Sequence, residues 1–417
     1  MRRPLLIPHL RRLWRDTHTL QLGTDPQLAT VLELQNPAMA RVLDLLDGSR
    51  SLRTVLAAAV EFAVTDREVE ALLTALRGTG LLVARQALLP VGLTDHQRDR
   101  MAREAGALAL AALRADPVGR RTGAPARRDG AGMSGRSPRP PAGNAPPAPL
   151  SSAASASPRG GRVSLAIRPD PTTPAEMLRR RAAAKVLVAG HAWLGALIAA
   201  ALGAAGVGRL DPALDGWTRV DDAMLGGLLP TDEHRSRASA AADAVRRIAP
   251  EAVLTPLREG DATFVVRVGS RPGSALATRG VRERGAARLD AYLRDGLVLV
   301  GPLVPPSGSP CGSCLELHRR DRDSAWPQLA AQIATARDSV EVCGVTTALA
   351  GAAYAAEEVL RHIDGRPVRT VGAVVEISGP GTARRRTWPP HPWCDCSRRR
   401  RSSGSGRQTD RPSNNGS

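Results

Sequence analysis

The sequence predicts an α/β fold with a smaller α+β domain at its N-terminus, and three observations lead to this. Lys185 to Gly190 is an apolar run that passes through a glycine turn into an alanine-rich segment, the order strand, turn, helix of a Rossmann-like domain. The first 85 residues instead read as short strands followed by three helices, a winged-helix order. Aromatic residues make up only 2% of the chain while alanine and leucine dominate its apolar share, which favours helical packing over an all-β fold.

The N-terminal domain is predicted over residues 1–87. Residues 17–22 and 30–34 have strand character, and residues 5–8 are a candidate third strand. A helix is expected after Asn36-Pro37, ending at Gly48, and Ser51 can cap the next one. A capping box, Thr65 to Glu68, precedes a third helix whose apolar residues recur at helical spacing: Val69, Leu72, Leu73 and Leu76.

This strand and helix order resembles the PqqD-like domains that recognise precursor peptides. The resemblance implies that an extended leader peptide adds as a strand to an exposed sheet edge and places apolar side chains beside a helix. By that resemblance, Val31 and Glu33 on a strand and Leu72 and Leu76 on the third helix flank the peptide groove. Core burial is the simpler alternative for each of these residues.

Residues 88–165 are predicted to be one polar-faced helix, about Asp95 to Arg114, followed by a disordered linker rich in Pro, Ala and Arg. Residues 397–417 are expected to form a disordered basic tail. The formal charge is +18, but residues 117–165 carry +7 and residues 397–417 carry +5. Because 12 of the 18 charges lie outside the expected domains, specific nucleic-acid binding is not expected.

Two further classes of protein are disfavoured. A DNA-binding winged helix would present residues 66–77, whose net charge of −1 suits phosphates poorly. Residues 186–208 carry no charge and are long enough to span a bilayer, but 13 of them are Ala or Gly and suggest a strand, a turn and a buried helix. Five cysteines and no secretion signal predict a cytoplasmic protein.

Residues 166–396 are predicted to form the second domain. Gly190, Gly195 and the small-residue run from Ala205 to Leu210 resemble the opening of ThiF-type (ubiquitin-activating-enzyme-like) adenylyltransferases. The resemblance implies that the two glycines, Asp215 and Arg237 mark a nucleotide site, with Asp215 at the ribose and Arg237 where the family has lysine.

The family's nucleotide motifs are nevertheless incomplete. His191, Ala192 and Trp193 replace its glycine-rich turn, its Asn-Leu-Asn-Arg-Gln stretch is absent from residues 218–229, and residues 269–271 stand where it carries an aspartate. Use of ATP is therefore doubtful.

Two cysteine pairs, Cys311 with Cys314 and Cys394 with Cys396, are the most specific feature of the chain. Two close pairs about 80 residues apart suit a four-thiolate zinc site, which is structural because no coordination position stays open. Ordinary reduced thiols are the alternative, and a mixed site with His391 replacing one thiolate is a variant. Cys343 is expected to be a small core residue.

The segments around these pairs resemble the ThiF-type partner proteins of thiazole/oxazole-modified peptide (TOMM) biosynthesis. The run from His318 to Asp323 beside the first pair is either a functional polar loop or, more simply, a solvated helix end.

The resemblances together imply a leader-peptide-binding scaffold in ribosomal peptide biosynthesis. It would present the precursor to a modifying enzyme such as a YcaO-type cyclodehydratase. The alternative is an active ThiF-type adenylyltransferase that uses ATP to activate a peptide carboxylate. A homodimer is a further expectation, since ThiF-type domains commonly pair.

Overall fold

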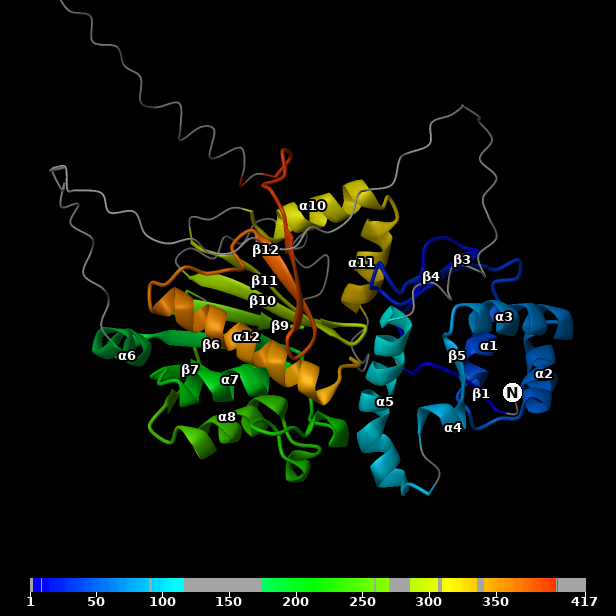
Figure 1. Ribbon diagram of the computed structural model, residues 1–417, viewed down its shortest axis with the longest axis horizontal. Helices are drawn as coiled ribbons and strands as arrows, with labels where there is room; N and C mark the ends of the chain where they lie inside the picture. The colour runs from blue at the N-terminus through cyan, green and yellow to red at the C-terminus, as the bar shows by residue number, and fades with distance from the viewer. Residues whose placement is uncertain are drawn as a thin grey trace, which may run out of the picture.

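The computed structural model describes residues 3–8, 10–89, 92–115, 174–258, 260–269, 286–306, 310–335, 341–394 and 396. The expected linker, apart from its leading helix, and the expected tail lie outside these residues. The described chain forms an N-terminal unit and a larger α/β unit, with one long helix between them (Figure 1).

The N-terminal unit contains two small sheets. Strands β2 (Arg12–Trp14), β3 (Thr19–Leu22) and β4 (Thr30–Glu33) form an antiparallel sheet in that order, while β1 (Pro4–Leu6) pairs with β5 (Leu82–Ala84). Helices α1 (Met39–Val42), α2 (Leu52–Ala59), α3 (Asp66–Gly78) and α4 (Arg85–Leu88) complete it, with two 3-10 turns, Leu43–Leu45 and Val60–Phe62. The expected order of strands and three helices is present; β2 was not anticipated.

The helix starts follow local hydrogen bonding. Ser51 caps α2 through the Thr54 N–H, and Thr65 with Glu68 forms the expected capping box of α3. The first helix differs from the prediction: the Asn36 side chain accepts from Ala38 N at 3.0 Å in a local turn, so α1 begins only at Met39 and runs directly into a 3-10 turn.

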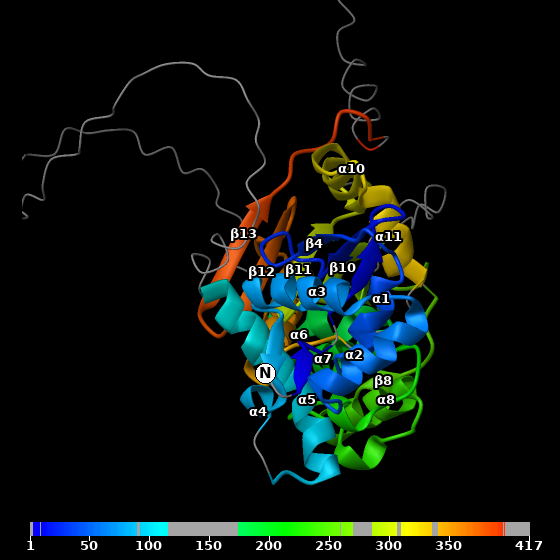
Figure 2. The ribbon, with the colours of Figure 1, turned by 90° about the vertical axis from the view of Figure 1, so that its right-hand side faces the viewer.

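Helix α5 (Asp95–Ala115) confirms the helix predicted over about Asp95 to Arg114, and it joins the two units. Its Leu110 is buried in the N-terminal core together with Val342 of the α/β unit. The Glu104 carboxylate on the same helix accepts from Val345 N at 2.7 Å. Figure 1 shows α5 between the blue N-terminal helices and the large sheet, and Figure 2 shows the molecule with the N-terminal unit toward the viewer.

The α/β unit is built on one eight-stranded sheet in the order β13-β12-β11-β10-β9-β6-β7-β8. Strands β10, β9, β6, β7 and β8 run parallel, the Rossmann-like part, and β11 to β13 add an antiparallel extension. The α/β fold class is therefore confirmed. The strand bounds are Lys185–Gly190 (β6), Arg209–Asp211 (β7), Val253–Leu254 (β8), Phe264–Val268 (β9), Ala287–Arg294 (β10), Leu297–Val304 (β11), Ala373–Gly379 (β12) and Thr382–Thr387 (β13).

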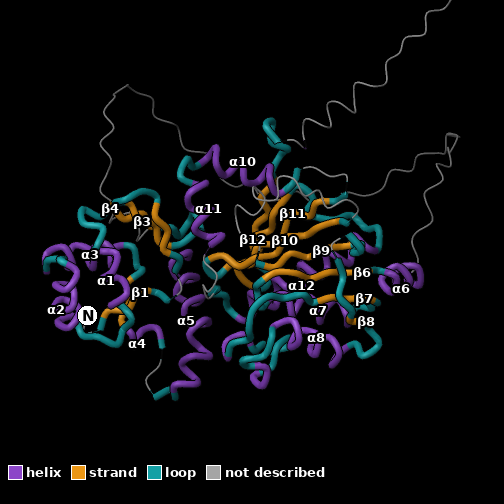
Figure 3. Tube along the Cα trace, turned by 180° about the vertical axis from the view of Figure 1, so that it is seen from behind, coloured by secondary structure: helices purple, strands orange, loops and turns teal. Residues whose placement is uncertain are grey.

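Helices α7 (Leu194–Ala204), α8 (Arg237–Ile248) and α12 (Val345–Ile363) share the main core with one face of this sheet (Figure 3). Helix α12 lies so close to β11 that a Cβ on Gly351 would come within 2.4 Å of Val298. The segment 186–208 is thus the expected strand, turn and buried helix. None of the helices described could cross a membrane, because none is both long and apolar enough.

The other sheet face, at β10 to β12, is covered by α10 (Gly312–Arg322), which packs Leu315 against Tyr292 and Leu299. Helix α11 (Trp326–Thr335) then reaches the N-terminal sheet, where Leu329 and Ile333 bury Leu13 of β2. Helix α6 (Pro174–Ala183) and the 3-10 turns Val220–Asp222 and Pro230–Asp232 complete the unit.

The turn between β10 and β11 connects the two units through Asp295. Its carboxylate accepts from Thr24 N at 2.6 Å, Thr24 Oγ1 at 3.0 Å and Asp25 N at 2.5 Å. Arg114 of α5 donates to the Asp295 carbonyl and to the buried Asp25 carboxylate. The two units therefore meet through charge-assisted hydrogen bonds as well as apolar contacts.

We expect Asp295→Asn to lower the free energy of unfolding by about 1–3 kcal/mol, because bonds to a carboxylate contribute more than bonds to an amide. Asparagine tolerates the left-handed backbone of this position, whose φ is 47°. Asp44→Asn is the control, since Asp44 is exposed and binds only Arg12 within its own unit. Urea unfolding measures both; equal losses would contradict the assignment of Asp295 as an anchor.

Candidate functional site

The expected glycine turn lies at the end of β6, and packing explains both of its glycines. Gly190 has a φ of 130°, and a Cβ there would lie 2.0 Å from the Val268 carbonyl oxygen of β9. A Cβ on Gly195 would lie 2.6 Å from Leu214. The glycines thus permit close approach of strands and helix, which is sufficient reason for them without a phosphate.

Trp193 is one of the three residues that stand in place of the expected glycine-rich turn. Its ring is buried, and the guanidinium of Arg103 on α5 lies 4.6 Å from the ring centroid. The tryptophan therefore packs toward the joining helix. The His191 N–H donates to the Val268 carbonyl at 3.2 Å and the Gly195 N–H to Ala192 at 3.1 Å, so these two amides of the turn have protein acceptors.

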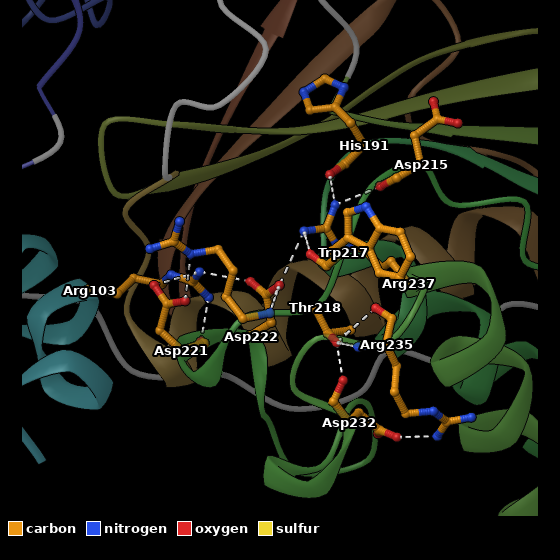
Figure 4. A network of polar contacts seen from close by, with 11 residues as sticks. Arg103, His191, Asp215, Trp217, Thr218, Asp221, Asp222, Asp232, Arg235 and Arg237 are labelled. Atoms are coloured by element: carbon orange, nitrogen blue, oxygen red, sulfur yellow. Dashed lines mark hydrogen bonds and ion pairs between the residues drawn. The ribbon is translucent and has the colours of Figure 1, made fainter. Parts of the chain in front are cut away.

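Arg237, at the start of α8, is committed to the protein itself. One guanidinium nitrogen donates to the His191 and Asp215 carbonyls, both at 2.7 Å, and the other to the Trp217 carbonyl at 2.9 Å (Figure 4). The Asp215 N–H in turn donates to the Gly190 carbonyl at 2.7 Å. Binding a phosphate with Arg237 would require breaking several of these bonds.

Asp222 joins Arg237 and Arg103 in a buried network of charges. Its carboxylate lies 3.2 Å from Arg237 and 2.9 Å from Arg103, and Arg103 also contacts Asp221 at 3.0 Å. Figure 4 shows the chain of contacts from α5 through Asp222 to Arg237. Buried charges of opposite sign are stable only when paired in this way. No sequence signal pointed to Arg103 or Asp222 as partners, because 118 or more residues separate them.

The structure thus brings Gly190, Gly195, Asp215 and Arg237 together at the ends of β6 and β9, as the resemblance implied. The exposed Asp215 side chain lies near His191, on the far side of its backbone from Arg237 (Figure 4). The position expected for the late aspartate follows β9, at Gly269; residues 270 and 271 lie outside the described chain.

We expect Asp222→Ala to cost about 3–5 kcal/mol of unfolding free energy, since it leaves the buried Arg237 guanidinium without a carboxylate partner and Arg103 with Asp221 alone. Asp243→Ala is the matched control: Asp243 also contacts two arginines, Arg235 and Arg246, but on the surface. Its loss should cost at most about 1 kcal/mol. Chemical denaturation compares the two variants, and similar losses would refute the role of the network.

The four paired cysteines converge as predicted. Their sulfur atoms all lie within 4.8 Å of one another, with Cys311 to Cys394 at 3.6 Å and Cys314 to Cys396 at 3.2 Å. Four thiolates bound to zinc at about 2.3 Å in a tetrahedron would be separated by about 3.8 Å. The sulfur positions therefore fit a four-coordinate metal, and no sulfur atoms are bonded to one another.

Local structure favours a thiolate at Cys311, whereas the hydrogen bond with Cys311 raises the pKa of Cys314 and burial raises the pKa of Cys394 to about 12. Cys311 is the N-cap of α10, where the helix dipole stabilises negative charge. A hydrogen bond from the Cys314 thiol is the main cause that lowers the pKa of Cys311 to about 4. The backbone N–H of His391 also donates to Cys314 Sγ at 3.3 Å.

The mixed site with His391 is disfavoured, because both ring nitrogens have other partners. Nε2 lies 2.7 Å from the Asp321 carboxylate, and Nδ1 accepts from Trp393 N at 3.2 Å. The His391 ring thus connects the segment that carries Cys394 to Asp321 of α10. Cys343 lies apart in the main core, where burial raises the pKa of its thiol to about 12, which confirms it as a core residue.

The residues predicted to bind peptide divide between surface and core. Val31 and Glu33 are exposed on β4, an edge strand with no partner beyond it among the described strands. Leu72 and Leu76 are buried in the N-terminal core, so in this structure they cannot touch a peptide and instead hold α3 in place. For these two leucines the simpler alternative, core burial, is correct.

The opposite edge of the same sheet is already occupied. The Gln332 side chain on α11 accepts from Trp14 N at 2.8 Å and donates to the Trp14 carbonyl at 2.7 Å. These two bonds use both backbone groups of an edge residue of β2, as a neighbouring strand would. Strand addition is therefore open at β4 and obstructed at β2.

No protein-family model matches the chain, and no curated protein matches it either. Some solved structures are similar to it at low identity. MccB of E. coli with succinimide has a TM-score of 0.43 and 11% identity, over 94% of this chain and 99% of that one. The microcin C7 biosynthetic enzyme MccB in complex with N-formylated MccA has a TM-score of 0.42 and 11% identity, again over 94% of this chain and 99% of that one. PaaA has a TM-score of 0.37 and 13% identity, over 91% of this chain and 98% of that one. With TM-scores below 0.5, these similarities carry no argument about what this chain binds.

Proposed function

We propose that this protein is a ThiF-like scaffold that binds the leader segment of a ribosomally made precursor peptide and presents it to a separate modifying enzyme. The free edge of β4 carries the proposal, because it offers unpaired backbone groups beside the exposed Val31. The partner implied by the sequence is a YcaO-type cyclodehydratase of the TOMM pathways, and the peptide would reach it while held on this edge.

The scaffold role is preferred to adenylyl transfer for a structural reason. Arg237, the cation that would meet a phosphate, donates to three carbonyl groups and to Asp222. A productive nucleotide site needs donors that are free when the ligand arrives. We therefore expect no ATP–pyrophosphate exchange with the bound peptide, and a robust exchange activity would restore the enzyme hypothesis.

Peptide binding can be tested with a randomised library of short displayed peptides selected on the full chain. We expect the selected peptides to alternate apolar residues, and hydrogen exchange to show protection of β4 amides when the tightest binder is added. Val31→Ser should weaken this binder about tenfold, because burying a valine side chain contributes about 1.5 kcal/mol or more.

Val60→Ser is the matched control, since Val60 is 65% exposed against 48% for Val31 but lies on a 3-10 turn away from β4. It should leave binding unchanged. Selected peptides that bind equally to both variants and leave β4 unprotected would refute recognition at this edge.

We further propose that the four-cysteine cluster binds one structural zinc ion. It would join the start of α10 to the segment after β13, two parts of the chain about 80 residues apart. Zinc prefers a closed tetrahedron of thiolates in such structural sites.

We expect elemental analysis of the purified protein to find about one zinc per chain. Cys311→Ser combined with Cys394→Ser should remove the metal and lower the melting temperature, since binding free energy stabilises the fold. Cys343→Ala is the control, because it removes a buried cysteine outside the cluster and should keep the zinc. A metal-free wild type that is as stable as the double variant would exclude the site.

A further inference from the structure

A cavity of about 510 Å³ lies between the two units, next to β4. One wall comes from the N-terminal unit, including Gln21 of β3, Val31 of β4 and the loop before β4. The opposite wall comes from β10 to β13 and from helices α10 and α11. Because Val31 is both exposed and part of the lining, the cavity adjoins the free strand edge.

Arginine dominates the polar lining. Three carboxylates line the cavity, those of Asp323, Glu341 and Glu376. Six arginines from the two units line it as well: Arg11, Arg15, Arg294, Arg319, Arg322 and Arg386. The run at the end of α10 that the sequence left open thus belongs in part to this cavity, rather than being only a solvated helix end.

The carboxylates present do not balance these arginines. Arg15 forms a two-pronged pair with Asp323 at 2.6 and 3.0 Å, which lowers the pKa of Asp323. Glu376 is shared by Arg294 at 2.9 Å and Arg386 at 3.0 Å.

Arg319 pairs with Glu316, a carboxylate outside the lining, at 2.6 Å, whereas the last two arginines are paired less closely. Arg11 lies 3.8 Å from Glu341, at the limit of an ion pair. Arg322 has no carboxylate partner within the described chain and lies over the Trp388 ring at 5.2 Å. Positive charge therefore remains in excess around the cavity.

Buried hydrogen-bond donors without acceptors also favour a bound anion in this cavity. Three buried N–H groups on lining residues have no acceptor among the described atoms: Arg11 Nη1, Arg294 Nε and Trp388 Nε1. A buried donor without an acceptor costs about 1–3 kcal/mol, so a cluster of them favours a bound acceptor. An anion satisfies both the excess charge and the donors.

We propose that this cavity binds a carboxylate of the peptide that adds to β4, and this rests on the function proposed above. Apolar lining residues, among them Leu299, Ile333 and Val374, suit the aliphatic stem of an acidic residue. The strand edge would then recognise the peptide backbone, and the cavity would select a peptide with an acidic side chain or a free C-terminal carboxylate next to it.

The probe is the tightest binder from the peptide selection, in three further forms: acidic side chains replaced by their amides, C-terminus amidated, and both. One of these changes should weaken binding to the full chain about tenfold, and which one identifies the source of the carboxylate. Unchanged affinity in all three forms, with β4 still protected by the peptide, would overturn this inference and leave the strand-edge function intact.

Matched arginine variants locate the effect. Arg322→Met should weaken the acidic form about tenfold and leave the fully amidated form unaffected, whereas Arg320→Met, on the same helix but outside the lining, should change neither. Arg11→Met and Arg12→Met form a second such pair, since Arg12 faces Asp44 instead. Equal losses within each pair, or displacement of the peptide by inorganic phosphate through the same arginines, would also overturn the assignment.

Discussion

The shared pairing of Asp222 with Arg103 and Arg237 is the interaction on which the arrangement of this molecule depends. One carboxylate, almost fully buried, lies between a guanidinium from the joining helix α5 and a guanidinium from the first turn of α8. Removing such charges from water is expensive, and only close pairing offsets the cost. The same contacts that pair Asp222 therefore fix α5 against the α/β unit. Because Leu110 of α5 is also buried in the N-terminal core, the position of α5 determines where the N-terminal unit lies.

This pairing also involves the cation that stands where the sequence predicted a nucleotide site. The donors of Arg237 bind the carbonyls of His191, Asp215 and Trp217 and the Asp222 carboxylate. Close packing at Gly190 and Gly195 is a sufficient reason for both glycines. Contacts within the protein therefore account for the conformation of this turn and for the position of Arg237.

Joining the two units creates the features proposed to recognise a peptide. Gln332 of α11 occupies one edge of this three-stranded sheet, and among the described strands the edge at β4 has no neighbour, which is the edge proposed to take the peptide. The cavity beside that edge has walls from both units, and neither unit alone would enclose it. Backbone pairing at the edge is tolerant of sequence, whereas charge in the cavity is selective, and the two together would give affinity with discrimination.

The sequence by itself determined the local elements and the motifs that depend on neighbours along the chain. The capping box at Thr65, the strand, turn and helix from Lys185 to Ala204, and the two cysteine pairs were all predictable, because residue type and spacing fix hydrogen bonds and periodicity within a few residues. Only the tertiary structure decided that Leu72 and Leu76 lie in the core and not beside a peptide groove, which cation faces which carboxylate, and where arginines from distant segments meet. Arg11 and Arg322 are more than 300 residues apart in sequence and line one cavity, and such contacts depend on how whole units pack, which no local pattern encodes.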